Sequence, residues 1–71
     1  DLEANSKVIV EGRVLQERSL FEGTKLIILD NGLEIVCECS DHFKGEVVRV
    51  EGIVENFQER KQIRALRVET I

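Results

Sequence analysis

The chain has 71 residues, no proline, tryptophan, tyrosine or methionine, and a net charge of −4 from 14 acidic and 10 basic residues. This length gives one domain with a thin core, and an apolar content made almost entirely of Val, Ile and Leu favours a sheet. The acidic balance argues against tight nonspecific binding of nucleic acid over the whole surface, and no apolar run approaches the roughly 20 residues of a membrane span.

The first predicted elements are a tail and a long strand. Residues 1–6 are polar and without pattern, so we expect a flexible tail there and place the folded domain at 7–71. The motif VIVEGRV at 8–14 alternates valine with other residues and predicts a strand over 7–17 with its valines facing inward. Gly12 lies inside this strand, and a glycine there indicates a bend, a bulge or a close backbone approach.

A hairpin follows, after an expected loop at 18–23. Its two strands, predicted over 24–30 and 33–39, flank the dipeptide Asn31-Gly32. Asn-Gly between two apolar runs is the strongest short hairpin signal, because a type I′ turn needs positive φ at both central positions. We therefore predict a two-residue turn, which fixes the register of the hairpin.

That register assigns the hairpin side chains to two faces. Ile28 lies opposite Ile35, and Leu26 lies opposite Cys37, on the face predicted to be core. The other face is then exposed and carries an aliphatic patch beside a cross-strand ion pair. This predicted open face consists of Ile27, Leu29, Val36, Lys25 and Glu38.

Cys37 and Cys39 are the only cysteines. At positions i and i+2 of a strand their side chains point the same way, roughly 6–7 Å apart, which is the long limit for a disulfide. We expect both to be reduced, buried and in a cytoplasmic protein. His42 adds only a third candidate ligand, without the second cysteine pair of a zinc site, so we expect no metal and place His42 on the surface.

The second half of the chain begins with a connection at 40–45, which is too short for a real helix. Within it, Phe43 is expected to close the barrel end. A fourth strand is predicted over 46–57 because VRVEGIV at 48–54 repeats the first motif, with valines at the same three positions. Gly52 in its centre indicates a second bend.

A turn at 58–61 leads to the last strand, predicted over 62–69. The inward pattern of this strand changes phase between Ala65 and Leu66, which predicts a bulge. The expected inward set is Ile63, Ala65, Leu66 and Val68.

Together these elements resemble the OB-fold, and most of all the compact nucleic-acid-binding OB domains of the anticodon-binding and replication protein A type. The segments that carry the resemblance are VIVEGRV (8–14), LIILDNGLEIV (26–36) and KGEVVRVEGIVENFQERKQIRALRVE (44–69). The resemblance implies an all-β, five-stranded antiparallel Greek-key barrel, with little or no helix between the third and fourth strands.

The resemblance also implies a binding surface. Members of the family bind single strands across the second and third strands, between the loop after strand one and the loop before strand five. In this role cations contact phosphates and aromatic rings stack on bases. The corresponding residues in this sequence are Arg13, Arg18, Phe21, Lys25, Ile27, Val36, Phe57, Arg60, Lys61 and Arg64.

One departure from the family pattern limits the expected affinity. The face of strands two and three carries aliphatic residues together with Glu34 and Glu38, where the family places aromatic and basic side chains. We therefore expect weak, salt-sensitive and sequence-independent binding of single-stranded DNA or RNA by a nonenzymatic accessory domain of a larger nucleic-acid-processing protein. No cofactor and no membrane partner are expected.

Several alternatives stay open at the level of sequence. Phe21 and Phe57 could cap the barrel ends instead of stacking on bases. The basic residues of the last hairpin, Arg60, Lys61 and Arg64, could be ordinary solvated charges, and Arg49 and Arg67 are expected to pair with glutamates. The alternative function is a protein-interaction domain that uses the aliphatic face formed by Ile27, Leu29 and Val36.

Overall fold

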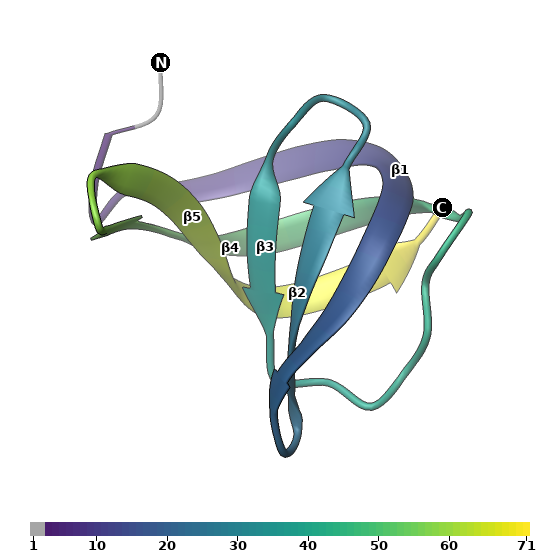
Figure 1. The fold of residues 1–71 in the computed structure, drawn as a ribbon. Coiled ribbons are helices and arrows are strands. Elements are labelled where there is room, and N and C mark those ends of the chain that lie inside the picture. Colours follow the sequence, from purple (N-terminus) through teal and green to yellow (C-terminus); the bar gives the residue numbers. More distant parts are fainter. Residues whose placement is uncertain (1–2) are drawn as a thin grey trace.

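The fold is known from a computed structural model that describes residues 3–71. These residues form five strands and no helix, and the strands close into a barrel in the order β1-β2-β3-β5-β4 (Figure 1). The strands are β1 (Lys7–Phe21), β2 (Thr24–Leu29), β3 (Glu34–Cys37), β4 (Val47–Phe57) and β5 (Arg60–Thr70). The predicted all-β barrel, without a helix between the third and fourth strands, is confirmed.

The barrel is closed by one parallel pair. β3 runs parallel to β5, with Ile35 beside Ile63 and Val36 beside Arg64. All other neighbouring strands are antiparallel. The sheet is therefore mixed, whereas the sequence predicted antiparallel pairing throughout, because β3 and β5 are not consecutive and meet only when the sheet closes.

β1 is the longest strand and belongs to both sides of the barrel. Residues 7–13 pair with β4, and the strand then passes to β2 across a register shift that leaves Leu15 without a partner. The expected loop at 18–23 is wrong, because β1 continues to Phe21 and only Glu22 and Gly23 form the turn to β2. Gly23 has φ +77°, which suits glycine.

The hairpin of β2 and β3 has a different register from the predicted one. Leu29 donates its backbone N–H to the carbonyl of Leu33 at 3.0 Å, and Gly32 donates to the carbonyl of Leu29 at 3.0 Å. The loop thus has three residues, Asp30, Asn31 and Gly32, and only Gly32 has positive φ (+87°). This is the type I turn with a glycine bulge that three-residue hairpin loops adopt.

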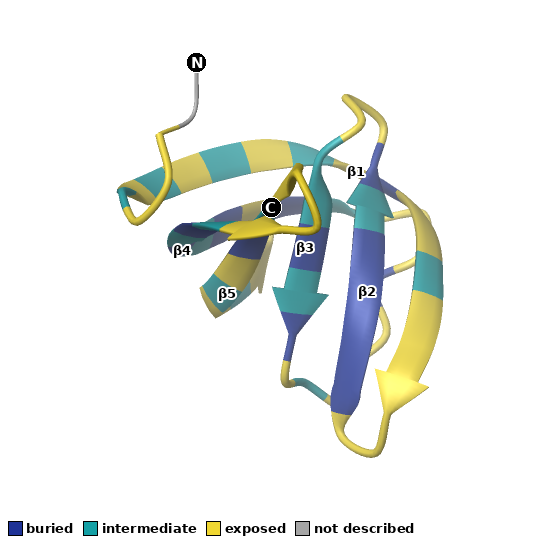
Figure 2. Cartoon of the chain, turned by 60° about the vertical axis from the view of Figure 1, so that its left-hand side comes forward, coloured by how far each residue is buried: buried dark blue, intermediate teal, exposed yellow. Residues whose placement is uncertain are grey.

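The extra loop residue exchanges the two faces of the hairpin. Ile27 now lies opposite Ile35, and Leu26 lies opposite Val36. Ile27 and Leu29 are 0% exposed, so the predicted open aliphatic face is wrong and they belong to the core. The protein-interaction surface expected at Ile27, Leu29 and Val36 does not exist in that form. β2 is buried over nearly its whole length in Figure 2.

A bulge in β5 confirms the predicted change of phase. Glu51 pairs with Arg67 and the next residue, Gly52, pairs with Ala65, so Leu66 has no partner on β4. Leu66 is exposed, which corrects its predicted inward position, because the bulge turns the extra residue out of the barrel. A Cβ on Gly52 would lie 2.5 Å from the carbonyl oxygen of Arg64, so β5 approaches too closely for any side chain there.

The core follows the alternation of the repeated motifs. The valines of the two repeated motifs face inward as predicted: Val14, Val48, Val50 and Val54 are buried, and Val8 and Val10 pack against them. Phe43 from the connection before β4 closes one end of the barrel, also as predicted. The buried core consists of Val14, Ile27, Leu29, Ile35, Cys37, Phe43, Val48, Val50, Val54 and Ile63.

Backbone hydrogen bonds join the segment before β1 to β4. Asn5 donates to the carbonyl of Val54 at 2.6 Å, and Val54 donates to the carbonyl of Ser6 at 2.9 Å. The flexible tail expected over 1–6 falls partly on residues 1–2, which lie outside the described residues. The turn expected at 58–61 is shorter than predicted, since Phe57 pairs with Arg60 and only residues 58–59 connect β4 to β5.

Candidate binding groove

A row of four side chains crosses the outer face of the sheet. Cross-strand neighbours share a face, and Arg18 on β1 neighbours Leu26 on β2, which neighbours Val36 on β3, which neighbours Arg64 on β5. The row therefore places two apolar side chains in the middle and a guanidinium group at each end.

A groove of about 820 Å³ lies over this row. Leu26 is only 8% exposed although it lies on the outer face, and with Val36 it forms part of the groove lining. The end of β1 and the end of β4 supply opposite rims, and the segment before β1 supplies a further wall. The lining residues are Ala4, Asn5, Leu20, Phe21, Leu26, Val36, Glu55, Asn56, Phe57 and Gln62.

The two rim phenylalanines are exposed. Phe21 is 69% exposed and Phe57 is 56% exposed, so the alternative that they cap the barrel ends is wrong. Phe21 stands at the two-residue turn between β1 and β2, and Phe57 stands at the turn between β4 and β5. Each tight turn places its aromatic side chain at the edge of the groove instead of in the core.

Carboxylates hold two of the predicted cations. Glu34 forms an ion pair with Arg60 and accepts a hydrogen bond from Gln62 Nε2 at 3.0 Å. Glu55 forms an ion pair with Arg64 at 3.0 Å. Arg60 and Arg64 are therefore charges of the last hairpin that are already partly neutralised. Lys61 follows Arg60 at the start of β5.

Arg18 differs from these two arginines. It is exposed on β1, and within residues 3–71 its side chain forms no ion pair and no hydrogen bond. Its place at the end of the Arg18–Leu26–Val36–Arg64 row leaves its guanidinium available beside the apolar floor.

Three residues predicted for the site lie elsewhere. Ile27 is in the core because of the hairpin register. Arg13 donates to the carbonyl of Gly45 at 2.6 Å, at the end of the barrel where β2 leads into its loop, which is the end opposite to the groove. Lys25 is buried and points into the barrel, so it contacts neither the groove nor Glu38 as predicted.

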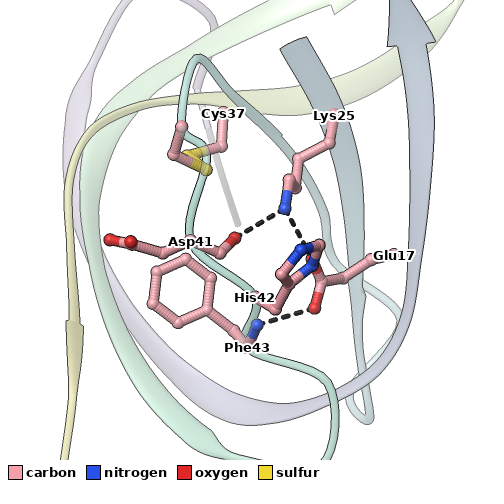
Figure 3. Close-up of a disulfide and its surroundings, with 7 residues drawn as sticks. Glu17, Lys25, Cys37, Asp41, His42 and Phe43 are labelled. Carbon is pink, nitrogen blue, oxygen red and sulfur yellow. Dashed lines mark hydrogen bonds and ion pairs between the residues drawn. A yellow bond between two sulfur atoms is a disulfide. The ribbon is translucent and has the colours of Figure 1, made fainter. Parts of the chain in front are cut away.

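Lys25 belongs to a network at the end of the barrel that Phe43 closes (Figure 3). Its ammonium group donates to Glu17 at 2.8 Å and to the carbonyl of Asp41 at 2.5 Å. Glu17 also accepts the backbone N–H groups of Phe43 and Lys44, each at 2.6 Å. The network fixes the connection between β3 and β4 to the barrel.

These bonds determine the charge of Glu17. Burial raises the pKa of the Glu17 carboxyl, but the hydrogen bonds from Lys25, Phe43 and Lys44, together with the charge of Lys25, lower it more, and the resulting pKa is below its ordinary value. The exposed imidazole of His42 lies 3.7 Å from the same carboxylate, and its exposure agrees with the predicted surface position.

Cys37 and Cys39 form a disulfide in the same region, which corrects the prediction that both are reduced. Their Cα atoms are 5.4 Å apart, closer than in an extended strand, because β3 ends at Cys37 and the chain turns before Cys39. The expected cytoplasmic location, which was inferred from reduced cysteines, stays a prediction. Within the described residues no three His, Cys, Asp or Glu side chains are grouped as metal ligands.

The face of the barrel formed by β1, β4 and β5 has a different chemistry. Arg49 pairs with Glu11 at 2.7 Å, and Arg67 pairs with Glu69 at 2.9 Å, as predicted for these two arginines. This face is covered by paired charges and supplies matched positions for control variants. Residues 3–71 contain no helix that could cross a membrane.

Some groove residues were not predicted from the sequence. The sequence predicts Leu26 in the core and Leu20 in a loop, whereas both line the groove. The missing information was the hairpin register, which decides whether Leu26 or Ile27 faces outward. Asn56 carried no signal in the sequence.

Comparisons with known proteins bear on the fold. No family model matches the chain, and no curated protein does. Among solved structures 19 chains match. One is in the crystal structure of the S. pombe Stn1-Ten1 complex, with a TM-score of 0.75 and 20% sequence identity over 92% of this chain. The chain has the OB-fold. At this identity the similarity shows the fold alone, and it covers 57% of the matched chain.

The groove lies over β2 and β3, between the β1–β2 turn and the β4–β5 turn. This is the region in which the resemblance to the OB-fold places a binding surface. Phe21, Val36 and Phe57 line it, and Arg18 and Arg64 end the row beneath it. The predicted site is thus brought together in part, with Leu26 in the place expected for Ile27.

Proposed function

We propose that this OB-fold domain is a nonenzymatic module that binds single-stranded nucleic acid in the groove between the β1–β2 turn and the β4–β5 turn. The observation that supports this most is the pair of exposed rings, Phe21 and Phe57, at the rims of one groove with an apolar floor. In proteins that bind single strands, unpaired bases commonly stack on exposed aromatic rings beside a groove that follows the nucleic-acid backbone.

Each part of the groove has a role in this proposal. The rings of Phe21 and Phe57 stack on bases, at roughly 1–3 kcal/mol per base. The floor of Leu26 and Val36 contacts base edges without hydrogen-bond donors or acceptors, so no base is preferred. Arg18 contacts a phosphate, because its guanidinium has no competing carboxylate within the described chain.

The carboxylates of the groove keep the affinity low. A phosphate reaches Arg60 or Arg64 only by displacing Glu34 or Glu55. Few phosphates are therefore neutralised, and binding depends on salt with a small slope. A domain of this kind serves as an accessory part of a larger nucleic-acid-processing protein.

A titration of the chain with labelled oligonucleotides tests the proposal. Fluorescence anisotropy with oligo-dT and oligo-U, at low and moderate salt, should show weak binding that salt reduces. Phe57→Ala should lower the affinity about tenfold, the equivalent of one lost stacking contact. Ile9→Ala is the matched control, because Ile9 is an equally exposed apolar residue on the β1–β4 face.

Chemical-shift mapping with the same oligonucleotide locates the site. Shifts should be confined to the rims and floor of the groove and to Arg18. Absence of binding at low salt, or equal effects of Phe57→Ala and Ile9→Ala, overturns the proposal.

A protein segment is the second candidate for the same groove. The groove lining joins Leu20, Phe21 and Phe57, all exposed, to the apolar floor, and contiguous exposed apolar surface commonly marks protein interfaces. The structure that the chain resembles is also that of a complex between two proteins. Absence of oligonucleotide binding at low salt favours this candidate.

A further inference from the structure

We propose that the far half of β5 is an interaction edge that pairs with the same edge of a second copy of this chain. The two strands are antiparallel and centred on Val68, so that β5 of each copy extends the sheet of the other. The inference concerns the backbone edge of β5 beyond Arg64, which does not line the groove, although Phe21 and Val36 line both the groove and the hollow beside this edge. It does not depend on nucleic-acid binding.

The edge exists because β3 is short. β3 has four residues and pairs with β5 only at Ile63 and Arg64. β5 then continues to Thr70 with β4 on one side only, and Figure 1 shows this yellow half running past β3. Within the described residues, the backbone of 65–70 has no second strand and no other backbone partner on that side. The other strands have neighbours on both sides at their centres.

Space is available beside this edge. A hollow of about 610 Å³ separates β5 from the connection between β3 and β4. Arg64–Val68 line one side, and Glu38, Cys39, Asp41 and Phe43 line the other. The connection thus lies beside the edge without hydrogen bonding to it, and an added strand meets free N–H and C=O groups, as in β-strand addition.

The charges of the edge are complementary to themselves in one orientation. Arg67 and Glu69 point to the same outer face, are exposed and form an ion pair with each other within one chain at 2.9 Å, so a second copy exchanges this pair for two pairs between the copies. In an antiparallel pair centred on Val68, Arg67 of each copy lies opposite Glu69 of the other, and the two Val68 side chains face each other. A parallel pair would instead place Arg67 beside Arg67 and Glu69 beside Glu69, which is repulsive. The edge therefore selects antiparallel pairing and a two-fold symmetric dimer.

Two features keep this association weak. The bulge at Leu66 distorts the start of the edge, and the charged side chains discourage pairing with unrelated strands. Only a few residues of each copy meet, so the interface is smaller than that of a stable dimer. The expected dimer forms reversibly as the protein concentration rises.

Charge reversal tests the proposal on the whole chain by sedimentation over a wide concentration range. The wild-type chain should approach twice its monomer mass at high concentration. Arg67→Glu and Glu69→Arg should each remain monomeric, because each places like charges opposite one another. An equimolar mixture of the two variants should associate, since one copy then presents two glutamates and the other two arginines. The double variant should behave as wild type.

Lys7→Glu is the control for Arg67→Glu, because it also replaces a positive charge by a negative one, but on β1 and not on the free edge of β5. It should leave association unchanged, and circular dichroism should show all variants folded. A monomeric wild-type chain at every concentration, or a mixture that stays monomeric, overturns the proposal. Association that both single reversals retain, or that Phe57→Ala alone abolishes, also overturns it and assigns the contact to another surface.

Discussion

The Glu17 carboxylate lies 2.8 Å from the Lys25 ammonium group, and both side chains are about nine-tenths buried. Neither charge is left unsatisfied, because Glu17 also accepts two backbone N–H groups and Lys25 also donates to a backbone carbonyl. The pair joins β1, β2 and the connection before β4 at the barrel end that carries the disulfide. A buried pair of this kind costs stability when one partner is removed.

Glu17→Gln should destabilise the chain in a manner that depends on pH. The folded-state pKa of Glu17 is lowered, so its contribution is present above the unfolded pKa, about 4.3, and is lost as the pH falls through the folded value. We expect a loss of about 2–4 kcal/mol near neutral pH. Urea unfolding should show that the gap between wild type and variant narrows as the pH falls below about 4.

Glu22→Gln is the control for this pH series. Glu22 lies in the exposed turn between β1 and β2, and its carboxyl has no ion pair within residues 3–71. Its removal should change stability by less than about 0.5 kcal/mol at any pH. A gap for Glu17→Gln that stays constant down to low pH contradicts the assigned role of the carboxylate.

The fold was predictable because several local signals agreed. The repeated valine motifs, the phase change near Leu66 and the short connection around Phe43 each pointed to a closed barrel, and the structure confirms these features. The hairpin register was not predictable in the same way. Aliphatic residues occupy both faces of β2, so alternation satisfies either register, and the choice depends on whether Asp30 belongs to the strand or to the loop.

The site inherits this ambiguity. The aromatic residues and arginines of the groove could be predicted from the sequence, since they lie at turns or strand ends. The floor of Leu26 and Val36 could not be predicted as a whole, because the hairpin register decides which side chains face outward. Lys25 was misplaced for a further reason: a lysine is rarely buried, and its partner Glu17 is eight positions away on another strand. No local pattern indicates such a pair.

The corrected register predicts opposite outcomes for two adjacent isoleucines. Ile27→Ala should lower the free energy of unfolding by about 3 kcal/mol, because a fully buried side chain leaves a cavity. Ile28→Ala should cost less than about 1.5 kcal/mol, because Ile28 faces outward and is half-buried. Urea unfolding of both variants measures the difference. A larger loss for Ile28→Ala would support the two-residue turn instead.

The two glycines of the repeated motif should differ in their tolerance of alanine. A Cβ at Gly52 meets the Arg64 carbonyl oxygen at 2.5 Å and Ile63 Cγ2 at 2.6 Å, so the backbone of β5 must move. Gly52→Ala should therefore cost about 3 kcal/mol or more. At Gly12 the nearest atoms are Asp30 Oδ1 at 3.0 Å and Leu29 Cβ and Cδ1, each at 3.3 Å, so these neighbours need to move by only a few tenths of an ångström.

Gly12→Ala thus serves as the matched comparison for Gly52→Ala. We expect a change within about 1 kcal/mol, since alanine also reduces the freedom of the unfolded chain and offsets part of the contact. Thermal unfolding followed by circular dichroism compares the two variants. Equal losses would show that both glycines are needed only for strand curvature and that the close approach at Gly52 is not decisive.

The acidic rim of the groove leads to a prediction of tighter binding on mutation. Glu55 forms an ion pair with the guanidinium of Arg64. Glu55→Gln removes this pair and leaves the Arg64 charge available at the end of the Arg18–Leu26–Val36–Arg64 row. The affinity for oligo-dT at low salt should rise about fivefold, the equivalent of ~1 kcal/mol. The salt slope should steepen by about 0.7, the value for one more phosphate contact on a single strand.

Glu11→Gln separates this local effect from the change in net charge. Glu11 pairs with Arg49 on the β1–β4 face, so its removal also takes away one negative charge and frees one arginine, but outside the groove. The two variants have the same net charge, and only Glu55→Gln should bind more tightly with a steeper salt slope. If both raise the affinity equally, the oligonucleotide responds to overall charge and the groove does not direct it to Arg64.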